Sequence, residues 1–173
     1  MRRINVHKLS AGFKQYASSL PSAALVASEA TSFESWFRVE LTMAILQLGY
    51  RRDELVFNYN YPTEENRRRK ADICFQDDKT IVFELKTFVS GADANKMGEF
   101  PKQNELLRSH VKSGHISQGV SFATFFGYSD QRMKKILGKL YQNPNNWTIS
   151  GPHKLVDDQP LVFVIAETDP NIA

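Results

Sequence analysis

The chain has 173 residues, a formal net charge of +3, and 42% hydrophobic and 24% charged residues. This length and composition favour one globular domain with a single hydrophobic core, and no apolar run approaches the roughly 20 residues that a membrane-spanning helix needs. The only cysteine, Cys74, excludes an intramolecular disulfide and a zinc site built from several cysteines, and the N-terminus lacks the apolar core of a signal peptide. We therefore expect an intracellular, cytoplasmic protein.

Helical and strand-like segments alternate along the chain. Residues 4–17 have apolar side chains at helical spacing, and Thr31 with Glu34 forms a capping-box pattern that opens a helix over residues 32–48. The later predicted elements are a strand at 55–61, a hairpin of 70–75 and 80–88, a helix at 101–112 with Pro101 in its first turn, a strand at 119–128, a helix from Ser129 to Tyr141 and a strand at 161–167. This order predicts an α/β sheet covered by helices. Residues 1–30 would form a helical extension packed on a domain spanning residues 31–173.

The predicted hairpin carries three charged residues in otherwise apolar strands. If its turn takes three residues, residue 76 lies opposite 80, 74 opposite 82, and Asp72 opposite Glu84. Glu84 and Lys86 share one face of their strand because side chains alternate. Two carboxylates opposite each other repel, and burying them is costly unless a cation compensates. A hard ion such as Mg²⁺ or Mn²⁺ suits such oxygen ligands; an exposed charge ladder on a solvated face is the alternative.

The predicted helix at 32–48 contributes another carboxylate. At about 100° per residue, Glu40 falls on the apolar side of this helix, whereas Glu34 falls on its polar side and is explained by capping. The apolar side comprises Phe33, Trp36, Phe37, Met43 and Ala44. We therefore expect Glu40, rather than Glu34, to be functional, with a buried ion pair to an arginine as the alternative.

The sequence resembles the PD-(D/E)xK nuclease superfamily in the pattern of its charged residues. This pattern consists of Glu40 on a helix, Asp72 at the start of a strand, and Glu84-Leu85-Lys86 on the next strand. The resemblance covers most of the region from residue 31 to residue 128, with Ala71 standing where the family nominally has proline. It implies a restriction-endonuclease-like mixed sheet with core order αβββαβ, flanked by helices, to which this chain adds an N-terminal helix. Many members also carry a glutamine in the following helix, a place that Gln103 occupies here.

The resemblance implies a Mg²⁺-dependent endonuclease, with Mn²⁺ able to substitute. Asp72, Glu84 and the backbone carbonyl of Leu85 would hold the ion, with Glu40 as a ligand directly, through water or through a second ion. Lys86 would orient and help to deprotonate the attacking water. The expected reaction is hydrolysis of a phosphodiester bond that leaves a 5′-phosphate.

Basic residues on one polar segment and two predicted helices are candidates for phosphate contacts. They are Arg67, Arg68, Arg69, Lys70, Lys102, Arg132, Lys135 and Lys139. DNA is favoured over RNA as the substrate, and cleavage of both strands with one site per chain would suit a homodimer. A catalytically inactive module on the same fold, binding nucleic acid or protein, and an RNA-cleaving enzyme are the alternatives.

Overall fold

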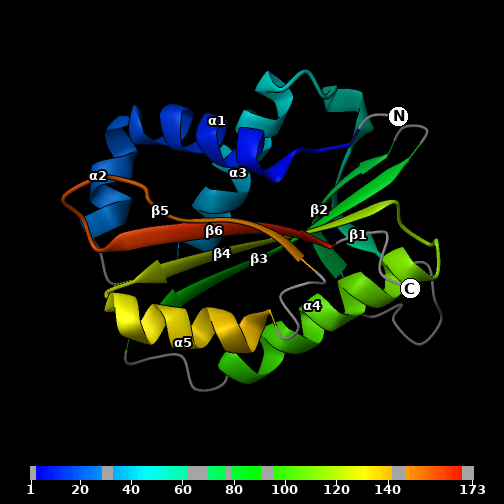
Figure 1. Cartoon of the computed structure of the whole chain (residues 1–173). Helices are drawn as coiled ribbons and strands as arrows, with labels where there is room; N and C mark the ends of the chain where they lie inside the picture. The colour runs from blue at the N-terminus through cyan, green and yellow to red at the C-terminus, as the bar shows by residue number, and fades with distance from the viewer. Residues whose placement is uncertain are drawn as a thin grey trace.

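The protein is an α/β structure in which helices flank a six-stranded mixed sheet, as the sequence predicts. The computed structural model describes residues 3–28, 33–61, 70–76, 79–90, 96–141 and 147–168. Helices α1, α2 and α3 cover one face of the sheet and α4 and α5 cover the other, which gives three layers (Figure 1). Within the described ranges, no helix is long and apolar enough to cross a membrane.

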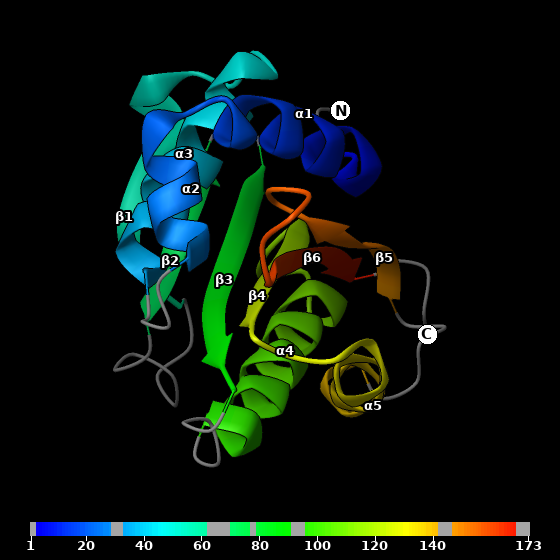
Figure 2. The ribbon, with the colours of Figure 1, turned by 90° about the vertical axis from the view of Figure 1, so that its left-hand side faces the viewer.

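The sheet has the strand order β1-β2-β3-β4-β6-β5, and its only parallel pair among the described strands is β3 with β4. The strands are β1 (Leu55–Asn60), β2 (Lys70–Gln76), β3 (Thr80–Val89), β4 (Gln118–Phe126), β5 (Trp147–Lys154) and β6 (Leu161–Thr168). The helices are α1 (Val6–Ser18), α2 (Pro21–Ser28), α3 (Glu34–Gln47), α4 (Lys96–Lys112) and α5 (Asp130–Leu140), with a 3₁₀ turn η1 (Arg52–Glu54) before β1. Helix α4 is the crossover that joins parallel β3 and β4. Figure 2, turned by 90°, shows β1 and β2 toward one edge of the sheet and β5 toward the other.

The predicted hairpin register is confirmed. Gln76 pairs with Thr80 and Cys74 pairs with Val82. The alternation of faces along β3 is confirmed too: Ile81, Phe83 and Leu85 belong to the hydrophobic cluster shared with α1 and α3. Val82 and Phe88 instead pack in the clusters that contain residues of α4. Glu84 therefore originates on the side of the sheet that α4 covers.

The start of one helix needs correction, and the structure adds one helix and one strand that were not predicted. Helix α4 begins at Lys96, so Pro101 lies inside the helix rather than in its first turn. Helix α2 follows α1 directly, where no element was predicted. Trp147, expected in a turn-rich segment, begins β5 and is 8% exposed; it packs edge-on against Tyr141, with ring centroids 5.2 Å apart. Strand β5 was missed because the alternation of apolar and polar residues covers only its first four positions before Gly151 and Pro152, where its pairing with β6 also shifts register between Ser150 and His153.

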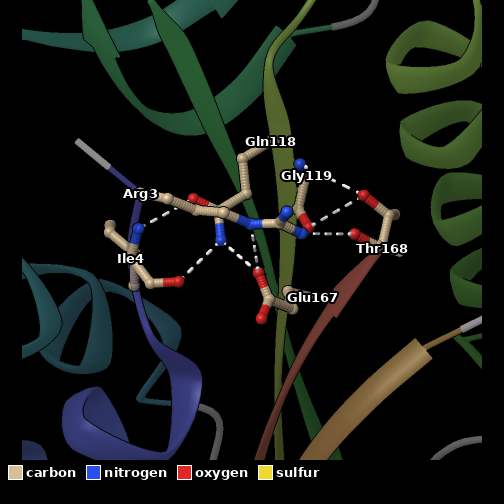
Figure 3. A network of polar contacts seen from close by, with 6 residues as sticks. All are labelled: Arg3, Ile4, Gln118, Gly119, Glu167 and Thr168. Atoms are coloured by element: carbon tan, nitrogen blue, oxygen red, sulfur yellow. Dashed lines mark hydrogen bonds and ion pairs between the residues drawn. The ribbon is translucent and has the colours of Figure 1, made fainter. Parts of the chain in front are cut away.

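The N-terminal segment is tied to the sheet by a polar network (Figure 3). The side chain of Gln118, the first residue of β4, accepts a hydrogen bond from the Ile4 N–H at 2.9 Å and donates one to the Ile4 carbonyl at 2.7 Å. The same amide donates to Glu167, which also pairs with Arg3 at 3.1 Å. Gln118 is 1% exposed, so each of its polar atoms needs such a partner. This network holds the residues that lead into α1, whose first turn is capped by the Asn5 side chain, and α1 then packs on α3, β5 and β6.

Candidate active site

The β2–β3 hairpin brings Asp72 and Glu84 together. Asp72 Oδ2 accepts a hydrogen bond of 2.8 Å from the backbone N–H of Leu85, the neighbour of Glu84 on β3. Continuing the observed register by one residue places position 72 opposite position 84. Glu84 is only 3% exposed, and Asp72 is half-buried. The hairpin thus holds two carboxylates side by side where little water can solvate them.

Burial and like charge both disfavour the ionised form of these carboxylates. The pKa of Glu84 is raised to about 8, first by burial and then by repulsion from Asp72 and Glu34, against the opposing effects of a hydrogen bond from Tyr61 and the charge of Lys86. The pKa of Asp72 is also raised, again chiefly by burial, although the Leu85 N–H opposes the shift. A perturbed acidic pair of this kind is a common feature of functional sites because a bound cation removes the penalty.

Lys86 and Glu34 complete the charged cluster. Lys86 Nζ lies 3.9 Å from Glu34 Oε2, and the side chains of Lys86 and Glu34 are 17% and 34% exposed. Glu34 also accepts a hydrogen bond of 3.3 Å from the Thr87 N–H. The first residue of α3 thereby reaches β3 beside Asp72 and Glu84, whose pKa values it raises.

The predicted orientation of α3 is corrected by the structure, which brings Glu34 rather than Glu40 to this cluster. Met43, expected on the core-facing side, is 41% exposed, and the buried positions of α3 are Phe37, Leu41, Thr42, Ala44 and Ile45. Glu34 lies on that buried side because it precedes Leu41 by seven residues, about two turns. Glu40 points elsewhere: together with burial, its hydrogen bond and charge raise the pKa of Tyr16 in α1.

Glu34 contacts β3 instead of taking the capping role that the sequence predicted for it. The Glu34 carboxylate binds β3, and the N-cap residue Phe33 makes no side-chain capping bond. Thr31, the predicted cap, lies outside the described residues. The predicted apolar side included Trp36 and Met43, whereas the buried side of α3 is centred between Phe37, Leu41 and Ile45 and is therefore turned toward Glu34.

A cavity of about 390 Å³ adjoins Glu84 on the α4 side. It is lined by Lys70, Glu84, Glu99, Lys102, Gln103 and Leu106. Gln103 Oε1 is buried and has no hydrogen-bond partner among the described residues. Gln103, Lys70 and Lys102, three of the predicted site residues, therefore surround the same space as Glu84.

The other predicted basic residues are not part of this cavity lining. Arg132, Lys135 and Lys139 are exposed on α5, which packs beside α4. The Arg132 guanidinium carbon lies 5.1 Å from the ring centroid of Tyr128, and the same guanidinium donates a hydrogen bond of 3.4 Å to Ser90 Oγ. The run Arg67, Arg68 and Arg69 lies outside the described residues.

Two residues at the site were missed by the sequence analysis. The Tyr61 hydroxyl donates a 2.6 Å hydrogen bond to Glu84 Oε1, and the charge of Arg38 on α3 acts on Asp72, lowering its pKa against the larger effect of burial. A tyrosine before a proline gives no signal of its partner, because only the packing of β1 against the hairpin determines where its hydroxyl points. Arg38 follows Glu34 by four residues, about one helical turn, and this spacing was the available signal.

The donor set fits a small hard cation. Mg²⁺ in proteins keeps several waters and takes one or two carboxylates together with substrate phosphates. Asp72 and Glu84 supply two carboxylates, and Oδ1 of Asp72 and Oε2 of Glu84 have no hydrogen-bond donor within the part of the chain that the structure describes. In that same part, no three or more His, Cys, Asp or Glu side chains form a ready metal-binding group.

Comparison with protein-family models gives no match, and neither the curated proteins nor the solved structures contain a significant match to this chain.

Proposed function

We propose that the protein is a metal-dependent nuclease of the PD-(D/E)xK type, with a restriction-endonuclease-like fold and DNA as its favoured substrate. One observation carries the proposal: the Asp72 carboxylate is held beside buried Glu84 by the Leu85 N–H, with Lys86 on the same strand. The element order from α3 through β1, β2, β3 and α4 to β4 supports it. A carboxylate pair can hold a metal ion that activates water, and a nearby lysine can stabilise the charge that develops as a phosphodiester is hydrolysed.

In this proposal Asp72, Glu84 and the Leu85 carbonyl hold Mg²⁺. The ion, when bound, lowers the pKa of a water and neutralises charge on the phosphate. Lys86 orients the attacking water, and Glu34, 3.9 Å from Lys86 Nζ, holds the ammonium group near the carboxylates. The water oxygen bonds to phosphorus while the bond to the 3′ oxygen breaks, which leaves a 5′-phosphate and a 3′-hydroxyl.

The residues around the cavity supply substrate contacts. Lys70 and Lys102 offer positive charge to the phosphate backbone, which in general provides most of the affinity for nucleic acid. Gln103 also lines the cavity beside Glu84, and its buried Oε1 is an acceptor with no hydrogen-bond partner among the described residues. Helix α5 lies beside α4, and its exposed residues Arg132, Lys135 and Lys139 would extend the basic surface along the nucleic-acid strand.

Cleavage assays test the proposal directly. Supercoiled plasmid, linear duplex, single-stranded DNA and RNA are incubated with the protein in Mg²⁺, Mn²⁺ or EDTA. Asp72→Asn and Lys86→Ala should each lower the metal-dependent rate by about 100-fold or more, the usual cost of removing a charge-stabilising group. Asp157→Asn and Lys154→Ala are matched controls because these two charges lie in exposed positions remote from the cavity lining.

The outcomes separate the remaining alternatives. Unchanged cleavage in both Asp72→Asn and Lys86→Ala would reject the catalytic roles. Tight binding of DNA with no cleavage under either metal would favour a binding module on the same fold. Cleavage of RNA alone would keep the mechanism and change the substrate.

A further inference from the structure

Tyr61 is a buried tyrosine whose hydroxyl meets the most buried carboxylate of the site. It follows β1, is 2% exposed, and donates a 2.6 Å hydrogen bond to Glu84 Oε1. Burial and the neighbouring charge of Glu84 raise the pKa of Tyr61 far above its ordinary value. The phenol therefore keeps its proton and acts as the donor in this bond.

The ring of Tyr61 is held from two directions. His110 of α4 stacks on it, with ring centroids 4.7 Å apart and an interplanar angle of 18°. Tyr59 of β1 approaches it edge-on at 6.4 Å. His110 is 3% exposed, and neither of its ring nitrogens has a hydrogen-bond partner among the described residues. Within the part of the chain that the structure describes, the imidazole thus acts as a flat packing surface for the phenol rather than as a polar contact.

We propose that Tyr61 is a positioning residue for the metal ligand Glu84. By occupying Oε1 and fixing the plane of the carboxylate, the hydroxyl leaves Oε2 as the oxygen that faces a divalent cation, while His110 keeps the phenol in place. This inference rests on the proposed function. Hydrogen bonds that orient ligating side chains typically account for about 10–100-fold in metal affinity. A Glu84 carboxylate that no hydroxyl orients would lose this gain in affinity.

Tyr61→Phe tests the role because it removes one oxygen and keeps the ring stacked on His110. Binding of Mn²⁺ is titrated by electron paramagnetic resonance of the free ion, without substrate. The dissociation constant of Tyr61→Phe should rise about 10–100-fold. Tyr59→Phe is the matched control: it removes the same atom two residues away, from a hydroxyl that interacts with Gln76 rather than with Glu84, and its Mn²⁺ affinity should equal that of the wild type.

A second pair of variants covers the case in which Tyr61→Phe does not fold. His110→Phe keeps a flat ring against Tyr61, whereas His110→Ala removes it, so only His110→Ala should weaken Mn²⁺ binding. Thermal unfolding in EDTA shows whether each variant is folded. Glu84→Gln supplies a further check, since Tyr61→Phe should have no additional effect on Mn²⁺ affinity once the carboxylate is gone.

The results distinguish this inference from the proposed function. Equal Mn²⁺ affinity in Tyr61→Phe and wild type overturns the positioning role and leaves the nuclease proposal intact. A wild-type protein that binds no Mn²⁺ overturns both. A loss of affinity in Tyr59→Phe as large as that in Tyr61→Phe would assign the effect to packing of β1 and would also reject the role of the hydroxyl.

Discussion

The raised pKa of Glu84 makes the metal-free protein less stable as the pH rises. In the folded state the pKa is about 8 instead of the ordinary 4.5. Below pH 4.5 the carboxyl is neutral in both the folded and the unfolded chain, so the folded state carries no penalty. As the pH rises from 4.5 toward 8, Glu84 ionises in the unfolded chain but stays protonated in the folded protein. The contribution of Glu84 to the free energy of unfolding therefore falls across this pH range.

The size of the effect follows from the same values. One pKa unit corresponds to about 1.36 kcal/mol, so the full change is about 5 kcal/mol by pH 9, of which about 3 kcal/mol is already lost at pH 7. These are upper limits, because water entering near Glu84 would reduce them. Glu84→Gln keeps the shape of the side chain and its acceptor for Tyr61, but it cannot ionise.

Urea unfolding of wild type and Glu84→Gln in EDTA, from pH 4.5 to pH 9, measures the difference. Taking the difference cancels the titrating groups that do not interact with Glu84, including His110 and His153, whose lowered pKa values act in the opposite direction. The free energy of unfolding of Glu84→Gln should exceed that of wild type increasingly with pH. Parallel curves across the range would refute the argument that Glu84 is buried without compensation. Saturating Mg²⁺ should stabilise wild type preferentially, because the ion binds the ionised carboxylate.

Three further predictions concern the helices and the N-terminal network. Glu34→Gln should reduce metal-dependent cleavage about 10-fold or more through Lys86, whereas Glu40→Gln should not, and the reverse order in the cleavage assay would restore the sequence-based choice. Gln118→Ala should lower the free energy of unfolding by about 1–3 kcal/mol because it leaves the Ile4 backbone groups without partners, as urea titration would show. Ser129→Ala should cost about 1 kcal/mol, since Ser129 Oγ accepts from the Arg132 N–H at the start of α5; an unchanged unfolding midpoint would reject the cap.

The hairpin was predictable because local rules determine it. A three-residue turn, assumed in the prediction, pairs Cys74 with Val82 as observed, and alternation along the strand then assigns each side chain to a face. The same reasoning brought Asp72 and Glu84 together before any tertiary contact was known. Strand β5 shows the limit: its sequence alternates over only four residues before Gly151 and Pro152, and its full length depends on pairing with β6.

The choice between Glu34 and Glu40 could not be made from the sequence. A helix with apolar residues on several sides has no unique inward direction, and the sheet, not the hydrophobicity of Met43 or Trp36, decides which side is buried. For the same reason the Tyr61 hydroxyl had no predictable partner. The sequence by itself determined the α/β class, the hairpin register and the pair of Asp72 and Glu84, because these depend on spacing along neighbouring strands. The tertiary structure alone decided that Glu34 and Tyr61 join them, because contacts between α3, β1 and the hairpin depend on how whole elements pack.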